Sequence, residues 1–184
     1  MKKPCPRRSE TPRKIPGRSN DMDLLIVDGF SLLHRHPESL AILNAGRAYP
    51  ARRFLVGEIG RICGALAERT IVVFDGQGDG GPAEDFAGIP VEVCYSPSGT
   101  TADLVIERLV RQAPDPDRVL VVTSDRQERE SVDAAGARHM GCGDFLEKLK
   151  SLSAELDRAA RTTAARAPPN RMDDWFPKDG LKAE

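Results

Sequence analysis

The chain has 184 residues, of which 40% are hydrophobic and 30% charged, a size and balance that suit one globular domain with tails. Its net charge of −1 is unevenly distributed, because residues 1–20 carry +6 and the remainder therefore carries −7. An acidic body argues against a basic surface that binds phosphates, and it leaves room for a cation site.

The four cysteines are widely spaced and form no C-x-x-C pair or Cys/His ligand spacing: Cys5, Cys63, Cys94 and Cys142. This pattern favours buried free thiols in a reducing cytoplasm over a disulfide framework or a zinc site. No apolar run approaches the roughly 20 residues that a membrane-spanning helix needs. The basic N-terminus also lacks the apolar segment of a secretory signal. We therefore expect a cytoplasmic protein that does not engage a membrane.

Both ends of the chain are predicted to lie outside the folded domain, which we place at residues 22–162. Residues 1–21 combine basic side chains with four prolines and too little apolar surface to order themselves. They are either a solubilising extension or an electrostatic arm for nucleic acid. Residues 163–184 are predicted to form a flexible tail, in which Met172–Phe176 is either more of the same or a docking segment.

An apolar run that ends in a carboxylate occurs three times along the chain. Leu24–Gly29 contains four apolar residues followed by Asp28 and a glycine, and Thr70–Asp75 and Val119–Asp125 repeat the pattern. Continuous branched apolar runs of this length are typical of strands buried on both faces of a parallel sheet. Ligand sites of open α/β sheets lie at the carboxyl ends of such strands.

The remaining segments alternate between helical and strand patterns. In chain order we expect a short helix at Phe30–Leu33, a helix at about Pro50–Glu68 with Phe54 on its apolar stripe, a strand at Val91–Tyr95, a helix from Thr100 to about Gln112 with Leu104 on its apolar face, a helix at about Gln127–Ala135 closed by Gly136, a strand at Ala137–Met140, and a last helix from about Asp144 towards Arg161. This alternation predicts a parallel, doubly wound α/β sheet.

One glycine-rich segment matches a nucleotide-binding motif only in its letters. Gly76–Gly81 reads G-x-G-x-x-G after a strand, but no sustained helical pattern begins within it. The dinucleotide site needs such a helix, whose N-terminus binds the pyrophosphate. We interpret the segment as a surface loop.

Four aspartates are expected at one edge of the sheet. Asp28, Asp75 and Asp125 each end a predicted strand, and Asp103 begins a helix at the same edge. Oxygen ligands without a nearby His or Cys favour Mg²⁺ or Mn²⁺, and such an ion can support phosphodiester cleavage. Each aspartate also has a structural explanation, as a helix cap or a turn residue. Their convergence on one edge favours the metal site.

Other polar residues near this edge are weaker candidates. Glu107 could complete a metal shell, but pairing with Arg111 explains it better. Arg129 could hold a nucleic-acid backbone or be a surface charge. We interpret His34 and His36 as surface residues.

The assembled segments resemble the YacP-like branch of NYN domains, within the wider group of PIN-like nucleases. The resemblance covers about residues 23–150 and rests on Leu24–Gly29 with Phe30–Leu33, Ile71–Asp75, Ser98–Asp103 with Ile106–Leu109, and Val121–Asp125. It implies a three-layer α/β/α PIN-like fold with a mostly parallel central sheet of about five strands. It also implies a Mg²⁺- or Mn²⁺-dependent ribonuclease whose ligands fall on Asp28, Asp75, Asp103 and Asp125. Some bacterial relatives are similar to ribosome-associated endonucleases that act on mRNA, so RNA and the ribosome are the implied partners.

The first hypothesis is a metal-dependent endoribonuclease. In it Asp28 and Asp125 bind metal, Asp103 shares a second ion or orients water, and Asp75 supports the site. The substrate would contact Ser31, Thr101, Ser124 and Arg126.

The second hypothesis is a catalytically inactive RNA- or ribosome-binding module with the same fold. It is motivated by the basic arm and by Ser31, which stands where the family usually has asparagine; Phe30 likewise replaces the usual tyrosine. A phosphatase of the haloacid dehalogenase type is a weaker alternative, because it needs an aspartate at the position of Phe30.

Overall fold

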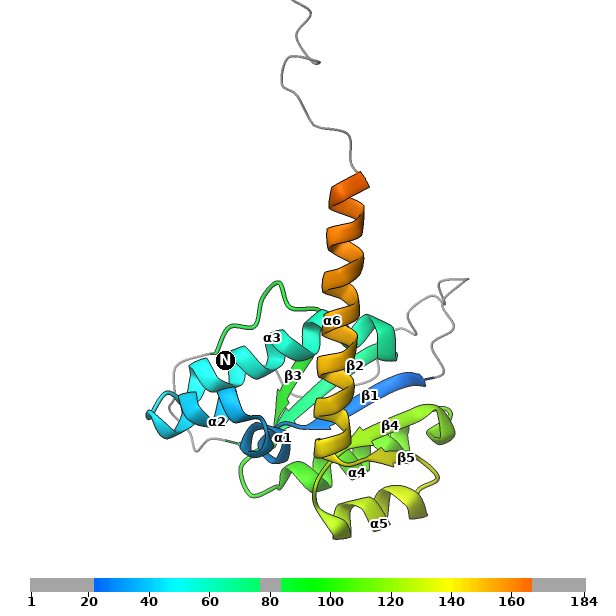
Figure 1. The fold of residues 1–184 in the computed structure, drawn as a ribbon. Helices are drawn as coiled ribbons and strands as arrows, with labels where there is room; N and C mark the ends of the chain where they lie inside the picture. The colour runs from blue at the N-terminus through cyan, green and yellow to red at the C-terminus, as the bar shows by residue number, and fades with distance from the viewer. Residues whose placement is uncertain (1–21, 77–83, 167–184) are drawn as a thin grey trace, which may run out of the picture.

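Five parallel strands form one sheet in the order β3-β2-β1-β4-β5 (Figure 1). The computed structural model describes residues 22–76 and 84–166. The strands are β1 (Met22–Asp28), β2 (Ala67–Phe74), β3 (Glu92–Tyr95), β4 (Val119–Val122) and β5 (Arg138–Met140). The predicted α/β/α fold with a parallel sheet of about five strands is confirmed.

Strand β1 is central and sets the register of its neighbours. Asp28, the last residue of β1, pairs with Val73 of β2, and Val27 pairs with Val122 of β4. The residues that follow β2 and β4 therefore emerge beside Asp28 at the carboxyl edge of the sheet. This register explains why carboxylates distant in sequence lie close together.

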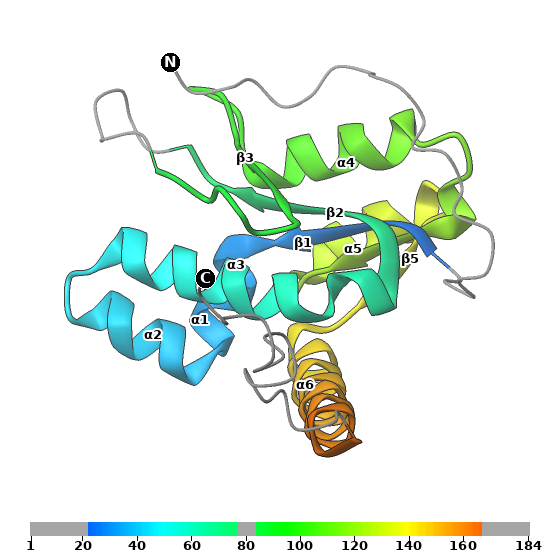
Figure 2. The ribbon, with the colours of Figure 1, turned by 90° about the horizontal axis from the view of Figure 1, so that it is seen from above.

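Helices cover both faces of the sheet (Figure 2). One layer contains α1 (Gly29–Arg35), α2 (Pro37–Asn44), α3 (Ala48–Leu66) and α6 (Cys142–Arg166). The other contains α4 (Ala102–Gln112) and α5 (Arg126–Ala134), and a single 3₁₀ turn, η1 (Pro116–Arg118), precedes β4. The C-terminal half of α6 extends away from the rest of the domain (Figure 1).

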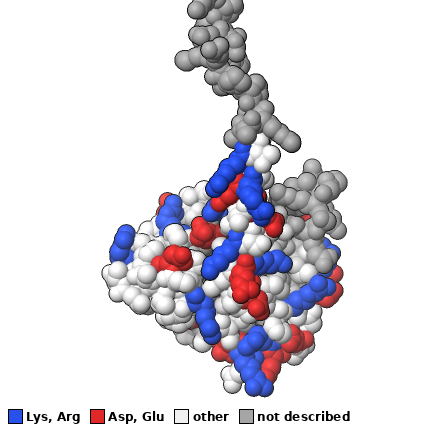
Figure 3. Space-filling model, in the orientation of Figure 1, with Lys and Arg blue, Asp and Glu red and all other residues white. Residues whose placement is uncertain are grey.

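The surface of the α3–α6 layer carries mixed charge. Basic and acidic side chains of the described residues alternate over the face that α6 occupies (Figure 3). Two of the pairs on α3 and α6 are Arg61 with Asp157, at 2.7 Å, and Arg61 with Glu58, at 3.7 Å. Exposed pairs of this kind contribute little stability each. The fold must therefore be stabilised chiefly by its apolar layers.

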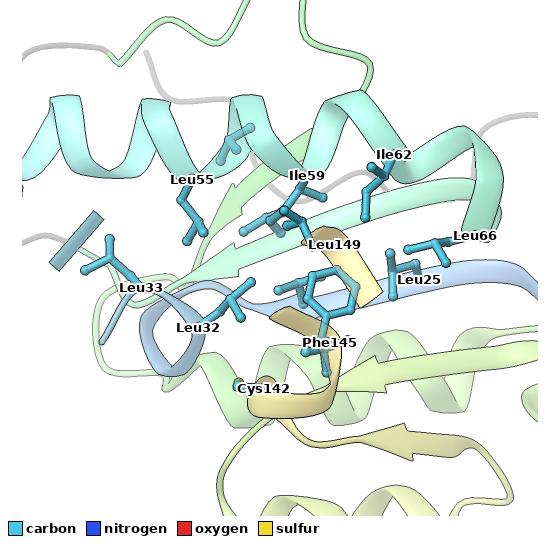
Figure 4. Close-up of a cluster of buried hydrophobic side chains, with 14 of the residues drawn as sticks. Leu25, Leu32, Leu33, Leu55, Ile59, Ile62, Leu66, Cys142, Phe145 and Leu149 are labelled. Atoms are coloured by element: carbon cyan, nitrogen blue, oxygen red, sulfur yellow. The ribbon is translucent and has the colours of Figure 1, made fainter. Parts of the chain in front are cut away.

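Each face of the sheet has its own apolar core. On the α3–α6 face, Phe145 of α6 is fully buried among side chains of α3 and β1, including Leu25, Ile59 and Leu55 (Figure 4). On the other face, Ile106 of α4 is fully buried in a second cluster. The buried strands thus contact apolar side chains on both faces, as their unbroken apolar runs predict.

The predicted elements are largely confirmed, with four corrections. Helix α2 was not predicted, and α6 begins two residues earlier than expected and continues past Arg161. Phe54 and Leu104 are 40% and 52% exposed rather than buried on the helix stripes. His36 is buried rather than at the surface, because its Nδ1 atom caps α2 through the backbone N–H of Ser39 at 3.2 Å.

Several predictions concern residues that the structure does not describe or leaves coarse. The arm at residues 1–21, most of the loop Gly76–Gly81, and Met172–Phe176 lie outside the described ranges. Within those ranges, Cys63, Cys94 and Cys142 are buried free thiols, as expected. None of the described helices is long and apolar enough to span a membrane.

A close contact behind Asp28 predicts opposite effects for two glycine-to-alanine substitutions. A Cβ atom on Gly29 would lie 2.4 Å from Cε1 of Phe74, whose buried ring stacks on Tyr95. Gly57, inside α3, has no such neighbour within 4 Å. We expect Gly29→Ala to lower the free energy of unfolding by about 1–3 kcal/mol, and Gly57→Ala to raise it by about 0.5–1 kcal/mol. Urea unfolding measures both, and a neutral Gly29→Ala would contradict the packing described.

Candidate metal centre

Three carboxylates from three different elements converge at the carboxyl edge of the sheet. Asp28 ends β1, Asp103 lies in the first turn of α4, and Glu128 lies in the first turn of α5. Each offers a carboxylate oxygen that lies within 4.8 Å of the oxygens of the other two. Asp28 and Glu128 are buried and Asp103 is exposed, so the group opens to solvent on the side of α4.

Asp28 is held rigidly by the elements on both sides of it. Its Oδ1 atom accepts the backbone N–H groups of Phe30 and Ser31, each at 3.1 Å, and so caps α1. Its Oδ2 atom accepts the hydroxyl of Thr123 at 3.4 Å, from the residue that follows β4. These bonds fix the orientation of a carboxylate that is only 5% exposed.

Glu128 is a buried acid with both oxygens unsatisfied. The residue is 6% exposed, and neither carboxylate oxygen has a hydrogen-bond partner among the described residues. Burial, followed by the charges of Asp28, Asp103 and Asp125, raises the pKa of Glu128 to about 7. The nearby Thr123 hydroxyl opposes the rise only weakly, since its one proton is directed at Asp28. Such a group is costly to bury unless something binds it.

Asp103 feels the same crowding from the solvent side. Partial burial raises its pKa, and the negative charges of Asp28, Asp125 and Asp75 raise it further. Neighbouring carboxylates thus disfavour ionisation at two of the three positions. A bound cation would remove this repulsion.

The other two predicted aspartates position helices. Oδ1 of Asp75 accepts the backbone N–H of Ala102 at 2.8 Å, which fixes the start of α4 one residue before Asp103. Oδ1 of Asp125 accepts the N–H groups of Gln127 at 2.6 Å and of Glu128 at 3.2 Å, so Asp125 caps α5. The capping explanation of Asp125 is therefore confirmed. Among the described residues, the three-carboxylate group contains Glu128 in the place predicted for Asp125.

The predicted substrate-contacting residues lie around this group. The N–H of Ser31 bonds to Asp28, and Thr101 caps α4 through the N–H of Leu104 at 3.4 Å. Ser124 is half-buried next to Thr123. Arg126 is exposed and pairs with Glu130 at 3.0 Å.

Two of the weaker candidates are now explained by their partners. Glu107 pairs with Arg111 at 2.5 Å, as predicted, and takes no part in the carboxylate group. Arg129 donates to the backbone carbonyl of Asp125 at 3.3 Å, so its guanidinium stays at the rim of the site.

Glu128 was not predicted, although the sequence contains a signal for it. Asp125 and Glu128 have the spacing of a capping box, in which the glutamate bonds back to the N–H of the cap residue. Here the Asp125 N–H instead donates to Thr123 Oγ1 at 3.0 Å, which leaves the glutamate free to point inward. Val132, one turn later, is buried on the same face of α5. A glutamate four residues before the only fully apolar position of a polar helix was the available clue.

The donor set fits a hard divalent cation. All three side chains offer carboxylate oxygens, and Glu128 supplies two buried oxygens without a hydrogen bond. Oxygen-only sites suit Mg²⁺ or Mn²⁺ better than zinc or copper. Asp28, Asp103 and Glu128 are therefore the residues that would hold such an ion.

Residues 25–183 match the family described as the YacP-like NYN domain. The chain belongs to this family. "Uncharacterized protein YacP" of Bacillus subtilis (strain 168) is 26% identical over 152 residues, which cover 82% of this chain and 89% of that protein. The crystal structure of Rae1 (YacP) from Bacillus subtilis has a TM-score of 0.68 and 27% identity, covering 78% of this chain and 83% of that one. A point mutant of Rae1 gives 0.65 and 27%, covering 79% and 86%.

The family assignment agrees with the geometry of the edge. NYN domains are of the PIN-like nuclease type, and an acidic cluster at the carboxyl edge is consistent with a metal site. The resemblance stated from the sequence is therefore confirmed.

If the three carboxylates bind a divalent cation, that cation must stabilise the fold. We expect Mn²⁺ at about 100 times its dissociation constant to raise the free energy of unfolding of the wild type by about 2.7 kcal/mol at pH 8. Glu128→Gln should lose most of this gain. Glu130→Gln, an equal charge change at an exposed position of α5, should keep it. Thermal unfolding with and without chelator measures the effect, and equal stabilisation of all three proteins would contradict the site.

The raised pKa of Glu128 predicts a pH dependence in chelator. The unfolded chain releases this proton near the ordinary pKa of 4.5, whereas the folded protein retains it to about 7. The stability of the wild type should therefore fall relative to Glu128→Gln as the pH rises through this window, by up to about 3 kcal/mol, and then level off. Urea unfolding at a series of pH values tests this. A constant difference between the two proteins would show that Glu128 titrates normally.

Proposed function

We propose that this protein is a metal-dependent endoribonuclease that hydrolyses phosphodiester bonds in RNA with Mg²⁺ or Mn²⁺. The observation that carries the proposal is Glu128, whose two buried oxygens lack a hydrogen bond and face Asp28 and Asp103. A merely structural glutamate would be paired or exposed. The membership of the chain in a family of nuclease type supports the same reading.

When bound, the metal would supply an activated water and would offset negative charge on the phosphate oxygens. The chain itself supplies the holding and orientation. Asp28 and Glu128 would hold the ion from the buried side, where capping bonds fix Asp28 and the helix start fixes Glu128. Asp103, exposed at the rim, would face the substrate and its water. Asp75 and Asp125 would act as positioning residues through the first turns of α4 and α5.

Ser31 is compatible with this arrangement. Residue 31 contributes to the capping of α1 through its backbone N–H, which serine and asparagine share. The orientation of Asp28 therefore does not depend on an amide side chain at this position. Thr101, Ser124, Ser31 and Arg126 lie around the carboxylates and are proposed as substrate contacts. Ribosome-associated mRNA is the proposed setting for the substrate, and the three buried free thiols support a reducing, cytoplasmic location.

Two isosteric substitutions test the proposal directly. We expect Asp28→Asn and Glu128→Gln to remain folded, since asparagine also caps helices well, and to lose at least about 100-fold in Mn²⁺-dependent cleavage of a labelled RNA. Glu130→Gln, on the same helix, is the matched control and should cleave like the wild type. Circular dichroism confirms folding, and gel analysis of the RNA reports cleavage.

The outcome also separates the two functions considered from the sequence. RNA binding without cleavage in Mg²⁺, Mn²⁺ or other divalent metals would establish the inactive RNA- or ribosome-binding module instead. Full cleavage by Glu128→Gln would show that a different group performs the chemistry.

A further inference from the structure

Two large apolar side chains are exposed beside the carboxylates. Four such side chains are exposed among the described residues: Phe30 (54%), Phe54 (40%), Leu104 (52%) and Leu156 (44%). A single exposed apolar residue needs no explanation. Phe30, however, lies two residues after Asp28, and Leu104 directly follows Asp103. Half of this set therefore adjoins the candidate metal centre.

The geometry places Phe30 and Leu104 on two sides of the same opening. The N–H of Phe30 bonds to Asp28 at 3.1 Å, in the first turn of α1, and Leu104 lies in the first turn of α4. Carboxylate oxygens of Asp28 and Asp103 lie within 4.8 Å of each other. The ring of His34 contacts that of Phe30 with centroids 4.4 Å apart at 59°. This tilted contact restrains the Phe30 ring without stacking over it.

We propose that Phe30 and Leu104 seat an unpaired base of single-stranded RNA next to the bond to be cleaved. The inference rests on the proposed function and deepens it by naming the form of the substrate. An aromatic ring presents a flat face on which any base can stack, and a leucine side chain can contact the edge of that base. Such contacts are tolerant of sequence.

The charge of the protein makes an uncharged contact necessary. Outside residues 1–20 the chain carries −7, and the site itself gathers five carboxylates with Asp75 and Asp125 included. Much of the affinity of a typical nucleic-acid protein comes from basic side chains that displace counterions from phosphates. Around this site that contribution is small. Stacking on Phe30 supplies affinity without positive charge.

The same contact excludes a duplex. Bases in a helix are stacked on each other, so their faces are not available to Phe30. Only unpaired nucleotides can use this rim. The structure therefore assigns single-stranded segments, rather than helices, as the substrate.

Binding measured in chelator tests this without any cleavage. The probe is a labelled oligouridylate, with an RNA duplex of equal length for comparison, against the full chain. We expect Phe30→Ala to weaken oligouridylate binding by about 5- to 100-fold, and Phe30→Trp to retain it. Phe54→Ala is the matched control, because Phe54 is also an exposed phenylalanine with a neighbouring histidine ring, His36 at 5.9 Å. Leu156→Ala is the equivalent control for Leu104→Ala, which should weaken binding less than Phe30→Ala.

The outcomes distinguish this inference from the proposed function. Selective loss with Phe30→Ala supports the stacking site even if no metal supports cleavage. Unchanged binding by Phe30→Ala, an equal loss with Phe54→Ala, or an equal effect on the duplex would overturn it. If cleavage persists with Phe30→Ala while KM for oligouridylate is unchanged, the rim does not contact the substrate and only the metal-dependent function stands.

Discussion

The structure depends on keeping mutually repelling carboxylates together at one edge of a sheet. Asp28, Asp103 and Glu128 come within 4.8 Å of each other, and two of them are buried. Unopposed charges this close would push the elements apart or take up protons. The N-termini of helices oppose the repulsion, since α1, α4 and α5 all begin at this edge and present N–H groups to carboxylates. Glu128 is the exception that this device leaves unsatisfied, and a cation is the partner it lacks.

Carboxylates at the edge thus divide into two kinds. Asp75 and Asp125 have an oxygen bonded to the backbone at the start of a helix, and each lies one to three residues from an acid of the metal group that it positions. Asp28 belongs to both kinds, because one oxygen caps α1 while the side chain also joins the group. Packing reinforces this arrangement. Gly29 admits the ring of Phe74 directly behind Asp28, so the backbone of β1 and the end of β2 are held together at the site.

The sequence predicts the sheet well because its signal is local. Four apolar residues before Asp28 and similar runs before Asp75 and Asp125 require burial on both faces, and the structure buries them on both. The positions of Phe54 and Leu104 were wrong for the opposite reason. Helical periodicity shows which residues share a face, but only the packed structure shows how far the neighbouring layer extends over it. Helix α2 was missed because its cap, the buried imidazole of His36, is an uncommon one.

Glu128 shows why the site itself was only partly predictable. Strand ends identify Asp28 and the capping aspartates, but the direction in which a helical glutamate points depends on a competing bond. That bond joins the Asp125 N–H to Thr123 and is invisible in the sequence. The most direct test of the cation site is a crystal structure of the wild-type protein soaked in Mn²⁺, with anomalous diffraction data. The account predicts one anomalous peak about 2.1 Å from carboxylate oxygens of Asp28 and Glu128. A peak coordinated elsewhere, or no peak at this edge at saturating Mn²⁺, would contradict it.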